Sequence, residues 1–202
     1  TDGVLLGAWA GVDNAKSILD VGTGTGLIAL MLAQRNGHAR ITAIEIDADA
    51  SAQADDNIFN SPFNENIKIE NISFHDFVAT DRPDKFDAIV SNPPFFINSL
   101  LADDASRSNA RHTHSLSLDD LLIHCKDLLN PNGTFSFIYP YDQIPQIEQH
   151  IINKGWHICR QTNVYPKPDS ALPKRVLLEL SLLPNVQTIT NNLVVETDRH
   201  KY

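Results

Sequence analysis

"SILDVGTGTGLIALMLAQR" (residues 17–35) joins an apolar run, a glycine-rich turn and a second apolar segment. Its first six residues are typical of a buried strand, and its last nine predict a helix that ends at the following Asn-Gly. Three glycines between them, Gly22, Gly24 and Gly26, let the backbone turn tightly and approach a ligand closely. The helix that follows offers free N–H groups at its start. This order indicates an α/β fold that binds a ligand beyond the carboxyl end of its first strand.

The rest of the chain alternates strand-like and helix-like segments. We expect strands at residues 17–22, 40–46, 67–74, 86–92, 134–140, 156–165 and 175–183, and helices at residues 27–35, 48–59, 117–129 and 143–155. Such alternation predicts a mostly parallel sheet with helices on both faces. The last two strands have no helix between them, so we expect an antiparallel hairpin at one edge. We predict one Rossmann-like α/β domain over residues 1–202 with a seven-stranded sheet, in which residues 1–10 are helical and residues 184–202 lie outside the sheet.

Composition excludes several classes of protein. The chain has 16 Lys and Arg against 25 Asp and Glu, a net charge of −9, which argues against broad, non-specific binding of nucleic acid but leaves room for a local basic patch. No apolar run approaches the roughly 18 residues of a membrane span, and no signal peptide opens the chain. Cys125 and Cys159 are too few for a disulfide framework or a zinc site, so we expect a cytoplasmic protein without a metal. Because the chain opens abruptly at Thr1, we expect further residues before it and after Tyr202.

Carboxylates stand at the ends of the first three predicted strands. Asp20 precedes the glycine loop, where it suits a ligand that carries an ammonium group. Glu45 ends the second strand and can accept both hydroxyls of a ribose. Asp76, followed by Phe77, comes after the third strand, where it can accept a hydrogen bond from an adenine amino group. Each carboxylate alone could simply cap a helix, but the set resembles the class I methyltransferases, which bind S-adenosylmethionine.

The fourth predicted strand ends in "AIVSNPPFF" (88–96). Asn-Pro-Pro-aromatic at this place resembles the methyltransferases that act on amino nitrogens conjugated to a ring or a carbonyl. Such a nitrogen is a poor nucleophile, and the Asn92 side-chain oxygen and the Pro93 carbonyl can hold its two N–H groups so that its lone pair meets the methyl group. Phe95 can stack on an extruded base, while Phe96 either stacks or belongs to the core. This resemblance makes Asn92, Pro93 and Phe95 the candidate catalytic residues, and Asn92 also a neighbour of the cofactor.

Nearly the whole chain is similar to the bacterial tRNA methyltransferases that modify adenine N6 next to the anticodon of a valine tRNA. The segments that carry this resemblance are "TDGVLLGAWA", the glycine loop, "SNPPFF", "ARHTHSLSLDDLL" and "LPKRVLLEL". The resemblance implies that Thr1 and Asp2 help to wall the cofactor site, and that the polar stretch after Phe96 forms part of the substrate cleft. Many relatives carry tyrosine where this chain has Phe95, but phenylalanine also stacks.

Two polar stretches suit a phosphate-binding rim for a tRNA partner. "SRSNARHTH" (106–114) has no acid, and "YPKPDSALPKR" (165–175) has one. Five cations there are candidate substrate contacts: Arg107, Arg111, Lys167, Lys174 and Arg175. They could equally be solvated cations of surface loops, and the histidines indicate no metal. We expect the core to take up the aromatic residues Trp9, Trp156, Phe135 and Phe137.

Three other functions remain open from the sequence: a protein glutamine-N5 methyltransferase, an rRNA guanine-N2 methyltransferase, and a non-catalytic module that binds the cofactor or RNA. The sequence also leaves the oligomeric state open, with a monomer as the first choice.

Overall fold

The structure, a computed structural model, describes residues 1–80, 85–93, 116–184 and 186–196. Its α-helices are α1 (Asp2–Trp9), α2 (Leu27–Arg35), α3 (Ala48–Phe59), α4 (Phe74–Ala79), α6 (Leu118–Leu128) and α7 (Ile144–Asn153), with one 3-10 turn, η1 (Tyr141–Gln143). Its strands are β1 (Ser17–Val21), β2 (Arg40–Glu45), β3 (Ile67–Asn71), β4 (Phe86–Ser91), β5 (Leu129–Pro140), β6 (His157–Tyr165), β7 (Arg175–Ser181) and β8 (Ile189–Val194). The predicted segments correspond to elements of the right type, and residues 1–10 are helical as expected.

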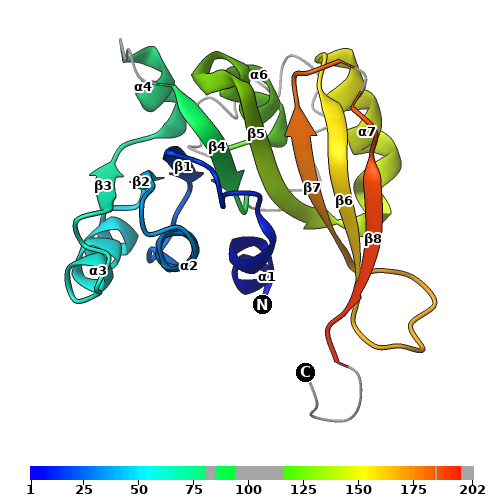
Figure 1. Ribbon diagram of the computed structural model, residues 1–202, viewed down its shortest axis with the longest axis horizontal. Helices are drawn as coiled ribbons and strands as arrows, with labels where there is room; N and C mark the ends of the chain where they lie inside the picture. Colours follow the sequence, from blue (N-terminus) through cyan, green and yellow to red (C-terminus); the bar gives the residue numbers. More distant parts are fainter. Residues whose placement is uncertain (81–84, 94–115, 185, 197–202) are drawn as a thin grey trace.

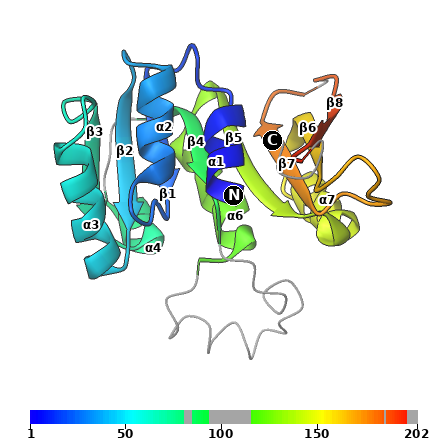
Figure 2. The same ribbon diagram turned by 90° about the horizontal axis from the view of Figure 1, so that it is seen from below.

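The strands form one sheet in the order β3-β2-β1-β4-β5-β7-β6-β8. The first five are mutually parallel, and β7 is antiparallel to both β5 and β6. Helices α1, α2 and α3 lie on one face, and α4, α6 and α7 on the other (Figures 1 and 2). The predicted fold class, including the antiparallel carboxy-terminal strands, is confirmed.

The predicted number of strands is wrong, because the carboxy-terminal tail contributes an eighth. Strand β8 pairs in parallel with β6 and forms the edge of the sheet. Its first five residues are all exposed, so no apolar pattern marked it as a strand.

The third strand also ends earlier than predicted, because α4 follows it. Strand β3 stops at Asn71, and Ser73 caps the new helix by accepting a hydrogen bond from the Asp76 amide. A six-residue helix is too short to show a helical period in the sequence.

Each face of the sheet has its own apolar core, as the alternation along β1 illustrates. Ile18 packs with the residues of α1, α2 and α3, whereas Leu19 and Val21 pack under α4, α6 and α7. The core prediction is confirmed for Phe135, Phe137 and Trp156, which are fully buried under the second group of helices, and Trp9 is half-buried. None of the described helices has the length and apolar character that crossing a membrane requires.

Candidate active site

The glycine loop between β1 and α2 leaves open space in front of its backbone. Gly22 and Gly24 have φ angles of 70° and 59°, in the left-handed region that favours glycine. A Cβ atom built on either would meet nothing within 4 Å, so protein packing does not explain the glycines there. Gly26, with a φ angle of 86°, is the N-cap of α2, and its Cβ position lies 3.4 Å from Ala54 Cβ. The loop therefore turns as predicted and admits a close ligand at its first two glycines.

Asp20 lies at the end of β1, and only one of its two carboxylate oxygens accepts a side-chain hydrogen bond from a described residue. The side chain is fully buried, and its Oδ2 accepts a hydrogen bond of 2.6 Å from the Thr23 hydroxyl. Its Oδ1 has no hydrogen-bond partner among the described residues. Burial raises the pKa of this carboxyl to about 7. The Thr23 hydroxyl and, more weakly, the Ala29 amide oppose the rise, and the charge of Glu45 adds least to it. A positively charged donor beside Oδ1 would favour the ionised form, so Asp20 fits the ammonium group that the sequence predicts.

Glu45, at the end of β2, braces the glycine loop. Its Oε2 accepts from the Gly24 amide at 2.8 Å, and its Oε1 accepts from the Asp47 amide at 2.9 Å. A carboxylate oxygen has a second lone pair, so both oxygens keep capacity for a further donor. This geometry is compatible with the predicted ribose contact, which stays a prediction.

Asp76 and Phe77 lie in the first turns of α4 rather than in a strand end. Asp76 is exposed and accepts from the Ser73 hydroxyl at 2.6 Å. Phe77 is fully buried in the core, and its backbone N–H donates to the Ser73 carbonyl at 2.8 Å. The geometry keeps Asp76 accessible as a candidate for the adenine contact. The Phe77 side chain belongs to the core, and its predicted place beside the cofactor stays a prediction.

The first turn of α1 lies against the helix that follows the glycine loop. A Cβ atom at Gly3 would lie 3.6 Å from Leu27 Cδ2 and 3.7 Å from Ile28 Cγ1. Thr1 is the exposed N-cap of α1, and Asp2 is its first residue. The structure thus brings the beginning of the chain to the same edge of the sheet as the loop.

Asn92 and Pro93 follow directly on β4, the neighbour of β1. The Asn92 Oδ1 atom is buried and has no hydrogen-bond partner among the described residues. Pro93 is buried as well, and the Ser91 hydroxyl donates to the Val21 carbonyl at 2.9 Å, which ties the ends of the two strands together. Phe95, Phe96, Arg107 and Arg111 lie outside the described residues.

The remaining predicted cations differ in their surroundings. Lys167 and Lys174 are exposed on the loop between β6 and β7. Arg175 Nε instead donates to Asp2 Oδ2 at 2.8 Å, and its Nη1 donates to the Lys174 carbonyl at 3.1 Å. Residue type and position gave no signal of the Asp2 partner, 173 positions away in the sequence. In the part of the chain that the structure describes, no group of three His, Cys, Asp or Glu side chains could hold a metal ion.

Comparison with known proteins identifies the family to which the chain belongs. Residues 5–143 match the family model of the methyltransferase small domain. The chain is 46% identical to the tRNA1(Val) (adenine(37)-N6)-methyltransferase of Parabacteroides distasonis, over all of this chain and 84% of that protein. It is 41% identical to the protein of the same name from Vibrio vulnificus, over 90% of this chain and 74% of that protein. The chain belongs to the tRNA1(Val) (adenine(37)-N6)-methyltransferase family.

The fold of this methyltransferase family member agrees with solved structures. An Agrobacterium tumefaciens protein described as a predicted O-methyltransferase superposes with a TM-score of 0.76 at 19% identity, covering all of this chain and 91% of that one. A glycopeptide N-methyltransferase complexed with S-adenosylmethionine superposes with a TM-score of 0.62 at 12% identity, covering 90% of this chain and 92% of that one. At these identities the likeness concerns the fold alone, which is that of the class I methyltransferases.

Proposed function

We propose that this protein is an S-adenosylmethionine-dependent methyltransferase that methylates N6 of adenine 37 in tRNA1(Val). Family membership supports the substrate. The observation that carries the chemistry is the buried Asn92 Oδ1, which follows the strand next to β1 and has no hydrogen-bond partner among the described residues. A buried acceptor without a partner costs about 1–3 kcal/mol, so a donor supplied by a substrate accounts for its presence there.

The residues around the glycine loop fit S-adenosylmethionine. This cofactor supplies, when bound, a methyl group on a positively charged sulfur. Asp20 Oδ1 would accept from its ammonium group, Glu45 from its ribose hydroxyls and Asp76 from its adenine amino group. Gly22 and Gly24 leave room for its close approach, because no protein atom fills the space where their Cβ atoms would stand.

The end of β4 would hold the target amine. Asn92 Oδ1 and the Pro93 carbonyl each accept one N–H of the adenine N6 group, which turns the lone pair of that nitrogen toward the methyl group. The nitrogen lone pair would form the bond to the methyl carbon while the carbon–sulfur bond breaks and leaves its electron pair on a neutral thioether sulfur. The nitrogen would then lose one proton to water. Positioned acceptors supply this catalysis without a strong base. Phe95 would stack on the base.

We propose further that residues 1–202 form a single methyltransferase domain that works on tRNA in the cytoplasm without a metal. Lys167 and Lys174, both exposed near the carboxyl edge of the sheet, would contact phosphates together with Arg107 and Arg111. These local cations would act on a body whose net charge is negative.

The test is methyl transfer from labelled S-adenosylmethionine to total tRNA from cells that lack the modification, followed by nucleoside analysis. We expect N6-methyladenosine at position 37 of tRNA1(Val). Parallel assays offer a protein fraction and rRNA as acceptors. Label in protein that resists ribonuclease would favour the glutamine-N5 alternative, and label in rRNA guanine the guanine-N2 alternative. Cofactor binding without any transfer would indicate a non-catalytic module.

A further inference from the structure

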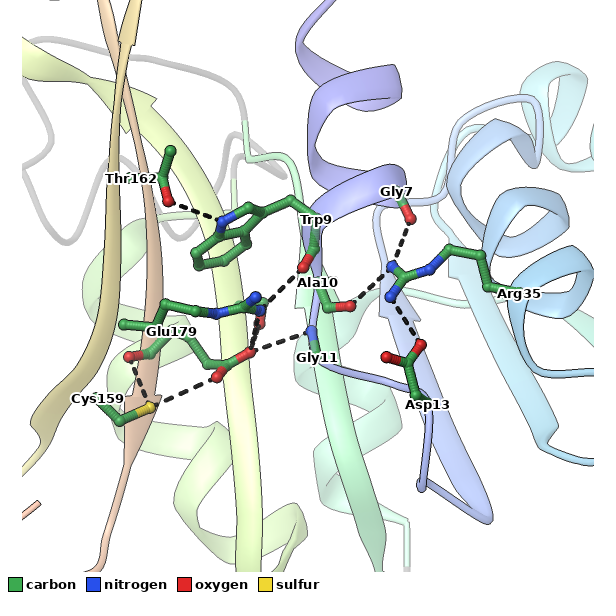
Figure 3. A network of polar contacts seen from close by, with 11 residues as sticks. Gly7, Trp9, Ala10, Gly11, Asp13, Arg35, Cys159, Thr162 and Glu179 are labelled. Carbon is green, nitrogen blue, oxygen red and sulfur yellow. Dashed lines mark hydrogen bonds and ion pairs between the residues drawn. The ribbon is translucent and has the colours of Figure 1, made fainter. Parts of the chain in front are cut away.

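Helix α1 is tied at its carboxyl end to strands β6 and β7 through a network of polar contacts (Figure 3). Glu179 Oε2 accepts from the Gly11 amide at 3.1 Å and from Arg160 Nη2 at 2.8 Å. The same Arg160 nitrogen donates to the Trp9 carbonyl at 2.9 Å, and the guanidinium lies 3.8 Å from the centre of the Trp9 ring. The indole N–H of Trp9 in turn donates to Thr162 Oγ1 at 2.9 Å.

An ion pair ties the other end of α1 to β7. Arg175 Nε lies 2.8 Å from Asp2 Oδ2, and the two side chains are 33% and 24% exposed. This partial burial excludes part of the surrounding water, so the pair is held more strongly than a fully exposed one. Arg175 opens β7, and Asp2 opens α1.

The residue next to Asp2 in the chain contacts the helix that follows the glycine loop. Gly3, next to Asp2 in the chain, packs on Leu27 and Ile28 at the beginning of α2, directly after Gly26. A shift of Asp2 would therefore move Gly3 and change its packing on the first turn of α2, which directly follows the loop.

We propose that Arg175 is a positioning residue for the cofactor, which it serves by holding Asp2 and the first turn of α1 against the glycine loop, rather than a phosphate contact for RNA. This inference rests on the proposed function, because it concerns the cofactor site of that enzyme. Asp2, Arg160 and Arg175 all lie outside residues 5–143, the part that matches the family model. Residues before and after the part that matches the family model thus meet in the contact between Asp2 and Arg175.

Direct binding of S-adenosylmethionine, measured by calorimetry without RNA, tests this role. Arg175→Ala is expected to weaken cofactor binding roughly two- to fivefold, the upper part of the range measured for ion pairs at a protein surface. Asp2→Asn should weaken it equally, and the double variant no further, because both changes break the same contact. The kcat at saturating cofactor should stay close to that of the wild type, and the KM for tRNA should not change.

The salt dependence of tRNA binding separates positioning from a phosphate contact. Loss of a phosphate contact lowers the slope of log K against log salt by about one. We expect this from Lys174→Ala, next in the chain and exposed, but not from Arg175→Ala. Arg40→Ala, which removes an exposed arginine at the start of β2 on the opposite edge of the sheet, should change neither quantity.

Two further variants distinguish loss of the ion pair from a general loss of structure. Thermal unfolding is measured for each protein, and Arg175→Lys keeps the charge but removes the Nε donor. The swap of Asp2→Arg with Arg175→Asp should restore part of the cofactor affinity. Normal cofactor affinity in Arg175→Ala with a reduced salt slope would overturn the inference and leave the proposed function intact. A wild type that binds no S-adenosylmethionine would overturn both.

Discussion

The end of β1 and the end of β4 differ in the kind of acceptor that each buries. The two strands are neighbours, with Asp20 opposite Val90, and each places one side-chain oxygen without a partner among the described residues: Asp20 Oδ1 on β1 and Asn92 Oδ1 just beyond β4. Asp20 can carry a charge, and Asn92 cannot. A carboxylate suits a cationic donor, whereas an amide oxygen suits a neutral N–H that must keep its lone pair for reaction.

This difference assigns the two strand ends to two ligands. The adenine N6 group is neutral, so neutral acceptors such as the Asn92 oxygen are enough to hold its two N–H groups. An ammonium group is charged, and a carboxylate accepts its hydrogen bonds while also neutralising that charge, which a neutral oxygen cannot do. The carboxylate therefore belongs on the cofactor side and the amide on the substrate side.

Asn92→Ala would remove the acceptor for the target amine and leave the cofactor site unchanged. We expect it to have the largest effect of the variants proposed. Loss of one positioned dipole at a reacting group typically lowers kcat by about 10²–10³-fold. Affinity for S-adenosylmethionine should change by less than about twofold, since Asp20 and the glycine loop stay intact. Steady-state methylation of tRNA1(Val) and calorimetric binding of the cofactor measure the two quantities.

Asn130→Ala is the matched control for this variant. Asn130 Nδ2 donates to Asp87 Oδ1 at 2.7 Å, near the opposite end of β4. Its loss should lower stability but spare kcat. A large loss of cofactor affinity in Asn92→Ala, with kcat unchanged, would contradict the division between the two strand ends.

Asp20→Asn would change the cofactor site and leave the acceptor for the target amine in place. It removes the charge that we expect to meet the ammonium group, and such a charge-assisted hydrogen bond contributes about 1.5–3 kcal/mol, or roughly ten- to a hundredfold in Kd. The kcat at saturating cofactor should fall much less than in Asn92→Ala. Asp87→Asn removes a carboxylate that accepts from the Lys16 and Ser17 amides at the other edge of the sheet, and it should leave the Kd unchanged.

The pH dependence of cofactor binding tests whether the charge of Asp20 binds the cofactor. The pKa of Asp20 rises from 3.8 to about 7 chiefly through burial, so below about pH 7 the free protein must lose a proton before its carboxylate can bind a cation. The Kd for S-adenosylmethionine should therefore rise by up to tenfold for each pH unit below 7, and level off above it. Calorimetry between pH 5.5 and 8.5 tests this, and in Asp20→Asn the dependence should disappear.

The same carboxyl gives folding stability an opposite trend with pH. Between about 3.8 and 7 the folded protein holds a proton on Asp20 that the unfolded chain has released, so this group's contribution to stability falls as pH rises through that window. Denaturant unfolding of Asp20→Asn against wild type isolates the contribution. Equal pH profiles for the two proteins would show that Asp20 ionises normally.

The sequence predicted the parallel half of the sheet because burial leaves a pattern. Strands β1 and β4 are buried along most of their length, and buried strands appear as continuous apolar runs. The exposed edge strand β8 and the short helix α4 have no such pattern, so only their tertiary surroundings define them.

The same distinction holds at the site. Asp20, Glu45 and Asn92 were predictable because the end of a strand fixes where a side chain lies, whatever its partners. The contacts between Arg175 and Asp2 and between Ser91 and Val21 were not, since a residue's type does not name a partner 173 or 70 positions away. Arg175 illustrates the consequence, because its charge suggested an RNA contact but gave no sign of its bond to Asp2.

Ser91→Ala tests how closely the two strand ends must be held, with the smallest effect that we predict. The buried hydrogen bond from its hydroxyl to the Val21 carbonyl is the side-chain tie between β1 and β4 at this edge, and its loss should cost about 1 kcal/mol of stability. A small displacement between cofactor and amine slows a reaction that depends on positioning, so we expect kcat to fall roughly three- to tenfold. Both binding constants should change little.

Ser17→Ala is the counterpart at the far end of the same two strands, where the Ser17 hydroxyl donates to the Lys85 carbonyl at 3.0 Å. It should cost stability as well but leave kcat unchanged, because no ligand lies between the strands there. If the two variants lowered kcat equally, the effect of Ser91 would follow from general loosening of the sheet. If only Ser91→Ala slowed methyl transfer, the spacing between the charged acceptor and the neutral one would itself be part of the catalytic arrangement.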